Sequence, residues 1–241
     1  MSERFFSSQP ISGERVTLDG AEAHHLLHVM RAAVGESVTL FDDSGAEFAA
    51  VVERLGRSDA GLRVIERRET DRELPFPLMV GVALPKGDRQ KWLVEKLTEL
   101  GVTTLVPLTT ERGVAQPSTS AIERLSRSVI ESAKQCGRNK LMQIAKRQAW
   151  DDWVTSGCLG QSASDAPDPL RLLAHPGGTP LAHIKVTSPL PTQLAIGPEG
   201  GLTDAEVAAA LSNGWQQVDL GPRILRVETA AVALAAAVTV R

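Results

Sequence analysis

Over the first 72 residues, apolar and polar positions alternate in short runs that are rich in β-branched residues. A period of two predicts strands with one buried face. The runs with this pattern are Arg15–Leu18, Ser37–Phe41, Glu47–Glu53 and Gly61–Arg67. The stretch Asp42–Gly45 between two of them predicts a hairpin turn, and Ala21–Ala33 predicts a helix with Asp19 as its N-cap. We therefore expect a small β-rich domain over residues 1–72.

From residue 73 onward the pattern changes to unbroken apolar runs separated by segments of helical length. An unbroken run is typical of a strand that is buried on both faces of a parallel sheet. These strands are expected at Leu78–Leu84, Thr103–Pro107, Leu172–Ala174, Gln193–Ile196 and Gln217–Leu220. The helices are expected at Asp88–Leu100, Ser120–Cys136, Thr203–Asn213 and Glu228–Val240. Ser120–Glu123 and Thr203–Glu206 have the spacing of capping boxes. Strands alternating with helices predict an α/β domain over residues 73–241, with a parallel sheet covered on both faces.

The last predicted helix is apolar on nearly every side. Such a helix must be buried all round, and a subunit interface would provide that burial. By contrast, residues 157–170 are rich in Gly, Ser, Pro, Asp and Ala, which predicts a mobile loop.

Composition places the chain among ordinary globular proteins, with 42% hydrophobic and 23% charged residues in 241. Its two cysteines, Cys136 and Cys158, form no CxxC motif, which favours a reducing, cytoplasmic setting. The N-terminus has no basic region followed by an apolar run, so we expect no signal peptide. The longest apolar stretch, Ala230–Val240, is too short to cross a bilayer, so no membrane association is expected.

The formal net charge of −3 conceals a local asymmetry. Residues 86–147 hold 12 Lys or Arg against 6 Asp or Glu, a local net charge of +6, whereas residues 1–75 hold 9 against 14, a net of −5. Phosphate attraction depends on local charge, so the middle segment is the candidate region to face a nucleic acid or another polyanion. Charge alone is equally compatible with a solvated helix surface.

Two glycine-bearing segments each join a predicted strand to a predicted helix. The first runs from Ile196 to Thr203 (IGPEGGLT) and the second from Leu220 to Ala230 (LGPRILRVETA). Glycine lets backbone N–H groups approach a ligand closely. Loops that follow parallel strands meet at the carboxyl edge of the sheet, where open α/β sheets bind ligands, so we expect these two loops side by side there. Neither segment is a dinucleotide fingerprint or a phosphate loop, and each is also compatible with a plain strand-to-helix turn.

Together, GPEGGLTDAEV and LGPRILRVETAA resemble the SPOUT methyltransferases, specifically the RsmE family, which makes N3-methyluridine in 16S ribosomal RNA. Further matches in the same order run along the chain: His25–Arg31 with Val34-Gly35, Lys86–Arg89, Lys96–Gly101, Glu111-Arg112 and Gln135–Arg138. The chain departs from the family pattern at Lys91 and Lys134, where an acidic residue is expected, and it lacks an expected proline after Arg138.

The resemblance implies a PUA-like, RNA-binding β-barrel followed by an α/β domain with a deep trefoil knot. It implies S-adenosylmethionine as cofactor, a homodimer formed through the C-terminal domain, and the small ribosomal subunit as partner, with uridine 1498 of 16S rRNA as target. The cofactor residues that it implies are Leu173, His175, Ile196, Gly197, Glu199, Gly200, Gly201, Leu220, Gly221, Ile224, Leu225, Arg226, Thr229 and Ala230.

Since the sulfonium methyl group is already activated, the family's chemistry needs correct positioning of the uracil and loss of the N3 proton. Our hypothesis is that Arg226 or Arg138 supplies positive charge near the uracil carbonyls and that Glu199 or Glu228 orients the site. Phosphate contacts are expected from Lys86, Arg112 and Arg138, and from Arg4 and Arg31 in the N-terminal domain. Taken alone, each of these cations is more often an ordinary solvated surface charge.

Three alternatives stay open. The chain could modify transfer RNA or another ribosomal position, or it could be a non-catalytic RNA-binding or assembly factor that retains the fold. The third, a nucleotide-dependent oxidoreductase, lacks its dinucleotide fingerprint. His24, His25 and His28 suggest a metal only weakly, because no carboxylate or cysteine stands at ligand spacing, so we expect no metal. Cys136 is expected to be a structural thiol.

Overall fold

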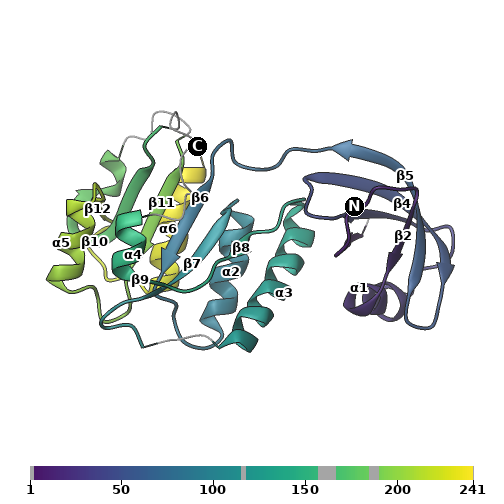
Figure 1. Ribbon diagram of the computed structural model, residues 1–241, viewed down its shortest axis with the longest axis horizontal. Coiled ribbons are helices and arrows are strands. Elements are labelled where there is room, and N and C mark those ends of the chain that lie inside the picture. Colours follow the sequence, from purple (N-terminus) through teal and green to yellow (C-terminus); the bar gives the residue numbers. More distant parts are fainter. Residues whose placement is uncertain (1–2, 115–117, 157–166, 185–189, 241) are drawn as a thin grey trace. The chain divides into compact units, whose positions relative to one another are not determined.

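The computed structural model describes residues 3–114, 118–156, 167–184 and 190–240. The chain forms two compact units (Figure 1). Unit 1 comprises Met1–Glu73 with Ile130–Leu141, and unit 2 comprises Leu74–Val129 with Met142–Arg241. The first division lies one residue from the boundary expected between residues 72 and 73, but nothing in the sequence pattern indicated that residues 130–141 belong with unit 1.

Unit 1 is built on a five-stranded sheet in the order β1-β3-β4-β5-β2. Its strands are β1 (Arg4–Phe6), β2 (Arg15–Leu18), β3 (Ser37–Phe41), β4 (Ala46–Leu55) and β5 (Ala60–Glu69). β1 pairs parallel with β3, and the other neighbours are antiparallel. Strands β2 to β5 correspond to the four predicted runs, whereas β1 was not predicted. The alternating side chains of β4 bury one face, and the core is formed around Phe5, Leu26 and Leu40.

The predicted helix 21–33 is shorter and less regular than expected. It consists of α1 (Gly20–His24) and a single π-helical turn, η1 (His25–Val29). Arg31 has a φ of 55°, a left-handed conformation that ends the helix. Asp19 stands at the N-cap position, but its side chain makes no capping hydrogen bond.

The C-terminal part of α3 (Thr119–Cys136) and the residues after it are bound into unit 1 by charged side chains. Arg138 is 3% exposed and donates through Nε and Nη2 to both carboxylate oxygens of Glu73, at 3.0 and 2.6 Å. Lys134 Nζ lies 3.1 Å from Glu22 Oε1 and 5.6 Å from the centre of the Phe5 ring. Lys134, one of the departures from the family pattern, is therefore an internal contact of unit 1.

Unit 2 contains a parallel sheet in the order β12-β10-β11-β6-β7-β8, with β9 paired to the far end of β7. The strands are β6 (Leu78–Val82), β7 (Thr104–Thr109), β8 (Gln143–Ile144), β9 (Gln148–Ala149), β10 (Leu170–Pro180), β11 (Thr192–Ile196) and β12 (Gln216–Asp219). Every pairing is parallel, as the unbroken apolar runs predicted. The expected mobile loop falls mostly on residues 157–166, outside the described residues, and Leu170 already belongs to β10.

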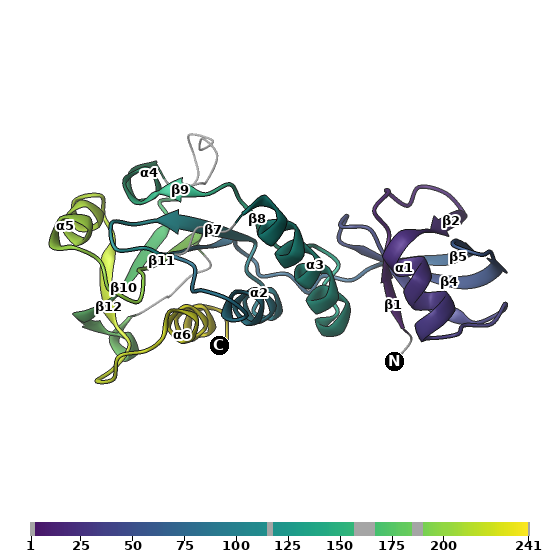
Figure 2. The same cartoon turned by 90° about the horizontal axis from the view of Figure 1, so that it is seen from below.

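Helices cover both faces of this sheet, with α2 and α6 on one side and α4 and α5 on the other (Figure 2). Their bounds are α2 (Arg89–Glu99), α4 (Trp150–Ser156), α5 (Asp204–Ser212) and α6 (Val227–Thr239), and a short 3-10 turn, η2, spans Leu181–His183. The capping box Thr203–Glu206 is present as predicted. The expected box at Ser120 is absent, because α3 begins one residue earlier and the Ser118 hydroxyl accepts from Ala121 N. Within the described ranges, no helix is long and apolar enough to cross a membrane.

The core beneath α4 and α5 depends on close contact between a tryptophan and the central strand. Trp153 is fully buried and lies 6.0 Å, centroid to centroid, from Trp215. A Cβ atom on Gly81 of β6 would lie 2.6 Å from two atoms of the Trp153 indole ring. Gly81 therefore allows the ring to rest directly on the sheet.

We predict that Gly81→Ala destabilises the protein by about 1–3 kcal/mol, since the added methyl group forces the buried ring to move. Chemical denaturation followed by circular dichroism would measure the loss. Gly13→Ala is the control, because a Cβ there meets no atom within 4 Å. Equal stability of the two variants would contradict this description of the core.

Candidate functional site

The strand register of unit 2 brings three chain segments together at one edge of the sheet. Ala174 of β10 is paired with Ile196 of β11 on one side and with Val218 of β12 on the other. All three strands run in the same direction, so their carboxyl ends lie at the same level. The two glycine-bearing loops meet there as predicted. β10 lies between their strands and contributes a third wall, in the segment from Leu173 to His175 that the resemblance implied.

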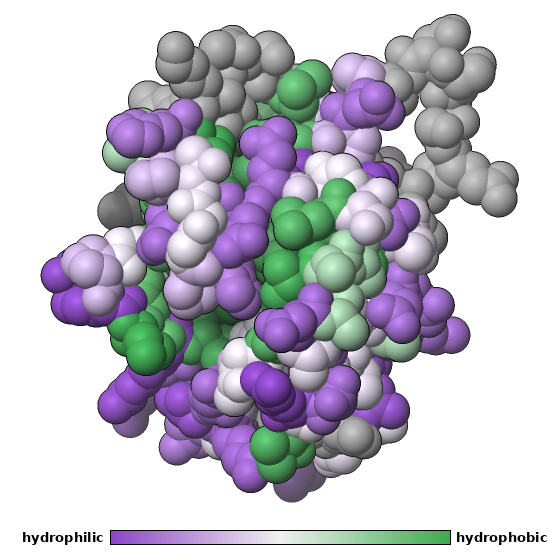
Figure 3. Space-filling model, turned by 90° about the vertical axis from the view of Figure 1, so that its left-hand side faces the viewer, coloured by the Kyte–Doolittle hydropathy of each residue, from purple (hydrophilic) through white to green (hydrophobic). Residues whose placement is uncertain are grey.

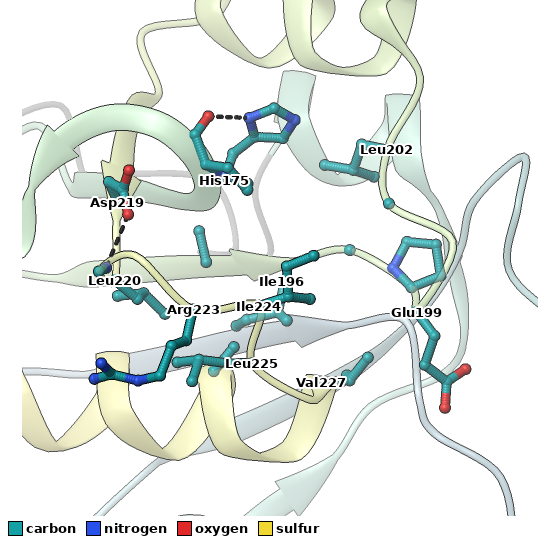
Figure 4. Close-up of a pocket in the computed structure, with 17 residues that line it drawn as sticks. His175, Ile196, Glu199, Leu202, Asp219, Leu220, Arg223, Ile224, Leu225 and Val227 are labelled. Carbon is teal, nitrogen blue, oxygen red and sulfur yellow. Dashed lines mark hydrogen bonds between the residues drawn. The ribbon is translucent and has the colours of Figure 1, made fainter.

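These segments enclose a cavity of about 260 Å³. Its walls are mostly apolar, with a few polar groups at the margin, as is typical of small-molecule sites (Figure 4). It is lined by Ala174, His175, Pro176, Ile196, Gly197, Pro198, Glu199, Gly201, Leu202, Asp219, Leu220, Gly221, Arg223, Ile224, Leu225, Val227 and Ala230. Apolar side chains also reach the surface among polar ones on the side of unit 2 that bears α5 (Figure 3). Ile224 of the cavity wall is 97% exposed.

The loop after β11 is held in shape by backbone and side-chain hydrogen bonds. Gly201 N donates to Pro198 O at 2.8 Å, and Gly201 has a φ of 72°, which favours glycine. The buried carboxylate of Glu206 accepts from Thr203 N through one oxygen and from Glu111 N through the other, both at 2.8 Å. Glu206 thus ties this loop to the loop that follows β7.

Asp219 ties together the loops on the opposite side of the cavity. Its carboxylate accepts from Gly221 N at 2.8 Å and from Gly177 N at 3.0 Å. These two backbone donors hold the pKa of Asp219 below its ordinary value because they favour the charged form. Asp219 was not predicted, although it directly precedes the motif that begins at Leu220.

His175 is oriented by a neighbour on β12. Gln217 Nε2 lies 2.8 Å from Pro176 O and 3.0 Å from His175 Nδ1. His175 Nδ1 also lies 2.9 Å from Pro176 O, so the ring is held from both β12 and its own loop (Figure 4). The chain segment from His175 to Gly178 interrupts the pairing of β10 with β12 and supplies the third wall.

The structure gathers ten of the fourteen predicted cofactor residues around this cavity and leaves four outside its lining. Leu173 is fully buried in the core, whereas Gly200, Arg226 and Thr229 are exposed. The lining residues that are not among the fourteen are Ala174, Pro176, Pro198, Leu202, Asp219, Arg223 and Val227. All of them lie inside or next to the predicted segments, so extending each segment to its sequence neighbours would have included them.

The four candidate catalytic residues differ widely in surroundings. Arg226 is the N-cap of α6, and its exposed guanidinium makes no hydrogen bond or ion pair within the described part of the chain. Glu228, two residues on, is 6% exposed. Glu199 lines the cavity and receives a 2.7 Å bond from Arg89, and its carboxylate points away from the His175 ring (Figure 4). Arg138 belongs to unit 1 and is buried against Glu73.

The five residues expected to contact phosphate fall into two groups: cations that are exposed, and cations that are held by internal hydrogen bonds and ion pairs. Lys86 and Arg31 are exposed, and exposed Arg112 donates to Gly200 O at 3.3 Å. The Arg4 side chain is only 15% exposed and contacts Glu47 Oε2 at 3.0 Å and Asn139 Oδ1 at 2.6 Å. We therefore revise the assignments of Arg4 and Arg138: their guanidinium groups hold unit 1 together and are turned away from solvent.

The histidines and the cysteine form no metal site among the described residues. His24 and His28 do share a helix face, with ring centroids 4.9 Å apart. Cys136 is a partly buried free thiol within 3.9 Å of Ala133 O. Cys158 lies outside the described residues.

The family model of an RNA methyltransferase domain matches residues 72–239, and that of an RNA methyltransferase PUA domain matches residues 18–65. The ribosomal RNA small subunit methyltransferase E of Synechocystis is 38% identical over 91% of this chain and 71% of its own length. The Bacillus subtilis protein of the same name is 29% identical over 89% of this chain and 85% of its own.

Two solved structures are closely similar. One is a ribosomal RNA small subunit methyltransferase E from Neisseria gonorrhoeae bound to S-adenosylmethionine, with a TM-score of 0.87, 29% identity, and coverage of 98% of this chain and 96% of its own. The other, from Legionella pneumophila, also holds S-adenosylmethionine and has a TM-score of 0.87, 28% identity and the same coverage.

We predict that Arg138→Ala lowers the free energy of unfolding by about 1–3 kcal/mol, because it leaves the largely buried Glu73 carboxylate without its partner. Lys86→Ala, at an exposed cation, should change stability by less than about 0.5 kcal/mol. Urea titration would measure both. If Arg138→Ala were as stable as the native chain, the revised role of Arg138 would be wrong.

Proposed function

The chain belongs to the ribosomal RNA small subunit methyltransferase E family, and on that premise we propose that it methylates N3 of a single uridine, position 1498, in 16S ribosomal RNA. The cofactor is S-adenosylmethionine, which two structures 28% and 29% identical to this chain hold. The observation that carries the proposal is the cavity at the carboxyl edge of the sheet, formed by the two glycine-bearing motifs and His175.

The residues around the cavity suit this cofactor. Leu220, Ile224 and Leu225 offer apolar surface to an adenine ring. Positive φ angles of 72° at Gly201 and 112° at Gly221 bring the backbone close to the cavity without side chains in the way. The His175 ring and the Asp219 carboxylate lie at the margin, where the polar groups of a ligand could reach them.

The bound cofactor would supply an activated methyl group, and the chain's own residues would prepare the uridine. Arg226 lies between Leu225 and Val227 of the cavity wall, and its exposed guanidinium has no partner among the described residues. It can therefore face the uracil carbonyls and favour loss of the N3 proton. Arg138 no longer competes for that role within one chain, because Glu73 occupies its guanidinium. Glu199 remains the candidate to orient the site, since it lines the cavity.

Recognition of the RNA would rest on both units. The PUA family match at residues 18–65 supports an RNA-binding role for unit 1, in which Arg31 is exposed. In unit 2, Lys86 and Arg112 follow the ends of β6 and β7 at the same sheet edge as the cavity. These cations would bind phosphates while the target base enters the cavity, splayed out of its stack.

Three further features follow from family membership and remain proposals. They are a trefoil knot in unit 2, a homodimer formed through the C-terminal domain, and action in the cytoplasm on the small ribosomal subunit. The apolar α6, with six of its thirteen residues buried within one chain, supports the dimer, since its remaining alanines leave apolar surface for a second copy.

The decisive experiment supplies labelled S-adenosylmethionine and small subunits that lack the modification, followed by nuclease digestion and mass spectrometry. N3-methyluridine at one position would support the proposal. Label on transfer RNA instead would retain the enzyme class and overturn the substrate. Cofactor binding without transfer to any RNA would favour a binding or assembly role.

We predict that Asp219→Ala weakens S-adenosylmethionine binding several-fold, because two loops lose their common acceptor. Asp219→Asn should weaken it less, since one amide oxygen can still accept. Because the pKa of Asp219 is lowered, its contribution is complete at neutral pH and is lost only as the pH falls below the ordinary aspartate range. Calorimetry with exposed Asp204→Asn as control would test this, and unchanged affinity in Asp219→Ala would contradict it.

We predict that Lys86→Ala weakens RNA binding about equally for all sequences and reduces the slope of log K against log salt by about 0.7–0.9, as expected for one lost phosphate contact. Lys96→Ala is the matched control, because Lys96 is paired with Glu99 at 2.6 Å on α2. Fluorescence anisotropy at several salt concentrations would measure the slope. An unaltered slope for Lys86→Ala would remove Lys86 from the interface.

A further inference from the structure

A single guanidinium reaches both segments that carry the glycine motifs. Arg89 is the first residue of α2 and follows the loop after β6. Its Nη2 lies 2.7 Å from Glu199 Oε1, and its Nη1 lies 3.6 Å from Glu228 Oε2. Glu199 belongs to the loop after β11, and Glu228 is the second residue of α6. Arg89 itself does not line the cavity.

The Glu228 carboxylate depends on this arrangement. Its Oε2 atom is buried and finds no hydrogen-bond partner among the described residues. A buried carboxylate without compensation is costly, and the start of a helix offsets only part of that cost. Arg89 is the cation that the described structure pairs with it. Val227, the neighbour of Glu228, lines the cavity, so displacement of Glu228 would alter the cavity wall.

We propose that Arg89 is a positioning residue that holds the loop 197–203 and the first turn of α6 in a fixed relation through Glu199 and Glu228. A forked guanidinium can serve two carboxylates at once, whereas a lysine ammonium is a single point of charge. The fit of the cavity to S-adenosylmethionine would therefore require this one side chain outside it. Only the link to the cofactor rests on the proposed function; the restraint of the loop does not.

The expected effect is local. The Arg89 and Glu199 side chains are 36% and 46% exposed, and ion pairs with such exposure contribute little to global stability. The Arg89–Glu199 contact should therefore contribute little to the unfolding temperature, whereas loss of the cation beside the buried Glu228 carboxylate should lower it modestly. Loss of Arg89 should also free the loop 197–203, whose backbone amides would exchange hydrogen faster.

The test compares Arg89→Gln, Arg89→Lys, Glu199→Gln, the double variant Arg89→Gln/Glu199→Gln, and Lys91→Gln. Lys91 is the matched control, because it lies on the same helix, is 67% exposed and pairs only with Glu95 in the described structure. Hydrogen exchange of the ligand-free protein measures the loop, and calorimetry measures S-adenosylmethionine affinity. Both use the full chain.

We expect faster exchange confined to the loop 197–203 and the first turn of α6, and about fivefold weaker cofactor binding, in Arg89→Gln. Arg89→Lys should be intermediate, and Lys91→Gln should match the native chain. Glu199→Gln should weaken cofactor binding less than Arg89→Gln does, because Glu228 keeps its partner. The double variant should lose less binding free energy than the sum of the two single changes, since both remove the same contact.

Native exchange in Arg89→Gln would overturn the proposal, as would additive effects of Arg89→Gln and Glu199→Gln. Faster exchange throughout unit 2 would also overturn it, because Arg89 would then be a general structural residue. If the native chain bound no S-adenosylmethionine while Arg89→Gln still freed the loop 197–203 and the first turn of α6, the proposed function would fail and the positioning role would stand.

Discussion

Parallel pairing at one fixed register is the constraint on which the site depends. Ala174, Ile196 and Val218 lie opposite one another on β10, β11 and β12, so three chain segments leave the sheet at the same level. A slip of one residue would turn each side chain to the other face. The buried apolar strands and the helices on both faces prevent that slip. The position of the cavity is thus a direct consequence of how the buried strands pair.

The loops at this edge are held by side chains that accept from backbone N–H groups. Glu206 joins the loop after β11 to the loop after β7, and Asp219 joins the segment after β12 to the interruption in β10. Such bonds fix the loops before any ligand binds, which lowers the ordering cost of binding. The proposed role of Arg89 extends the same principle to a charged side chain. A cavity restrained from several directions can hold one uridine and one methyl donor in line, which is most of what methyl transfer requires.

The sequence pattern predicted the parts of this structure that local physics determines. Unbroken apolar runs predicted the parallel strands, the spacing of Thr203 and Glu206 predicted a cap, and the glycine motifs predicted the cavity edge. What it missed depends on contacts distant along the chain. β1 has three residues, too few for a period, and exists because β3 lies beside it. Arg138 is buried by Glu73, 65 residues away, so a pattern of basic residues could not distinguish it from exposed Lys86.

The central claim is that S-adenosylmethionine binds at this edge of unit 2, and a crystal structure of the protein grown with the cofactor tests it most directly. The account predicts cofactor density between the loops 196–202 and 219–225, with His175 at its margin. Density at another place on the chain would contradict the account. A cavity that stays empty at a cofactor concentration well above the dissociation constant measured in solution would also contradict it.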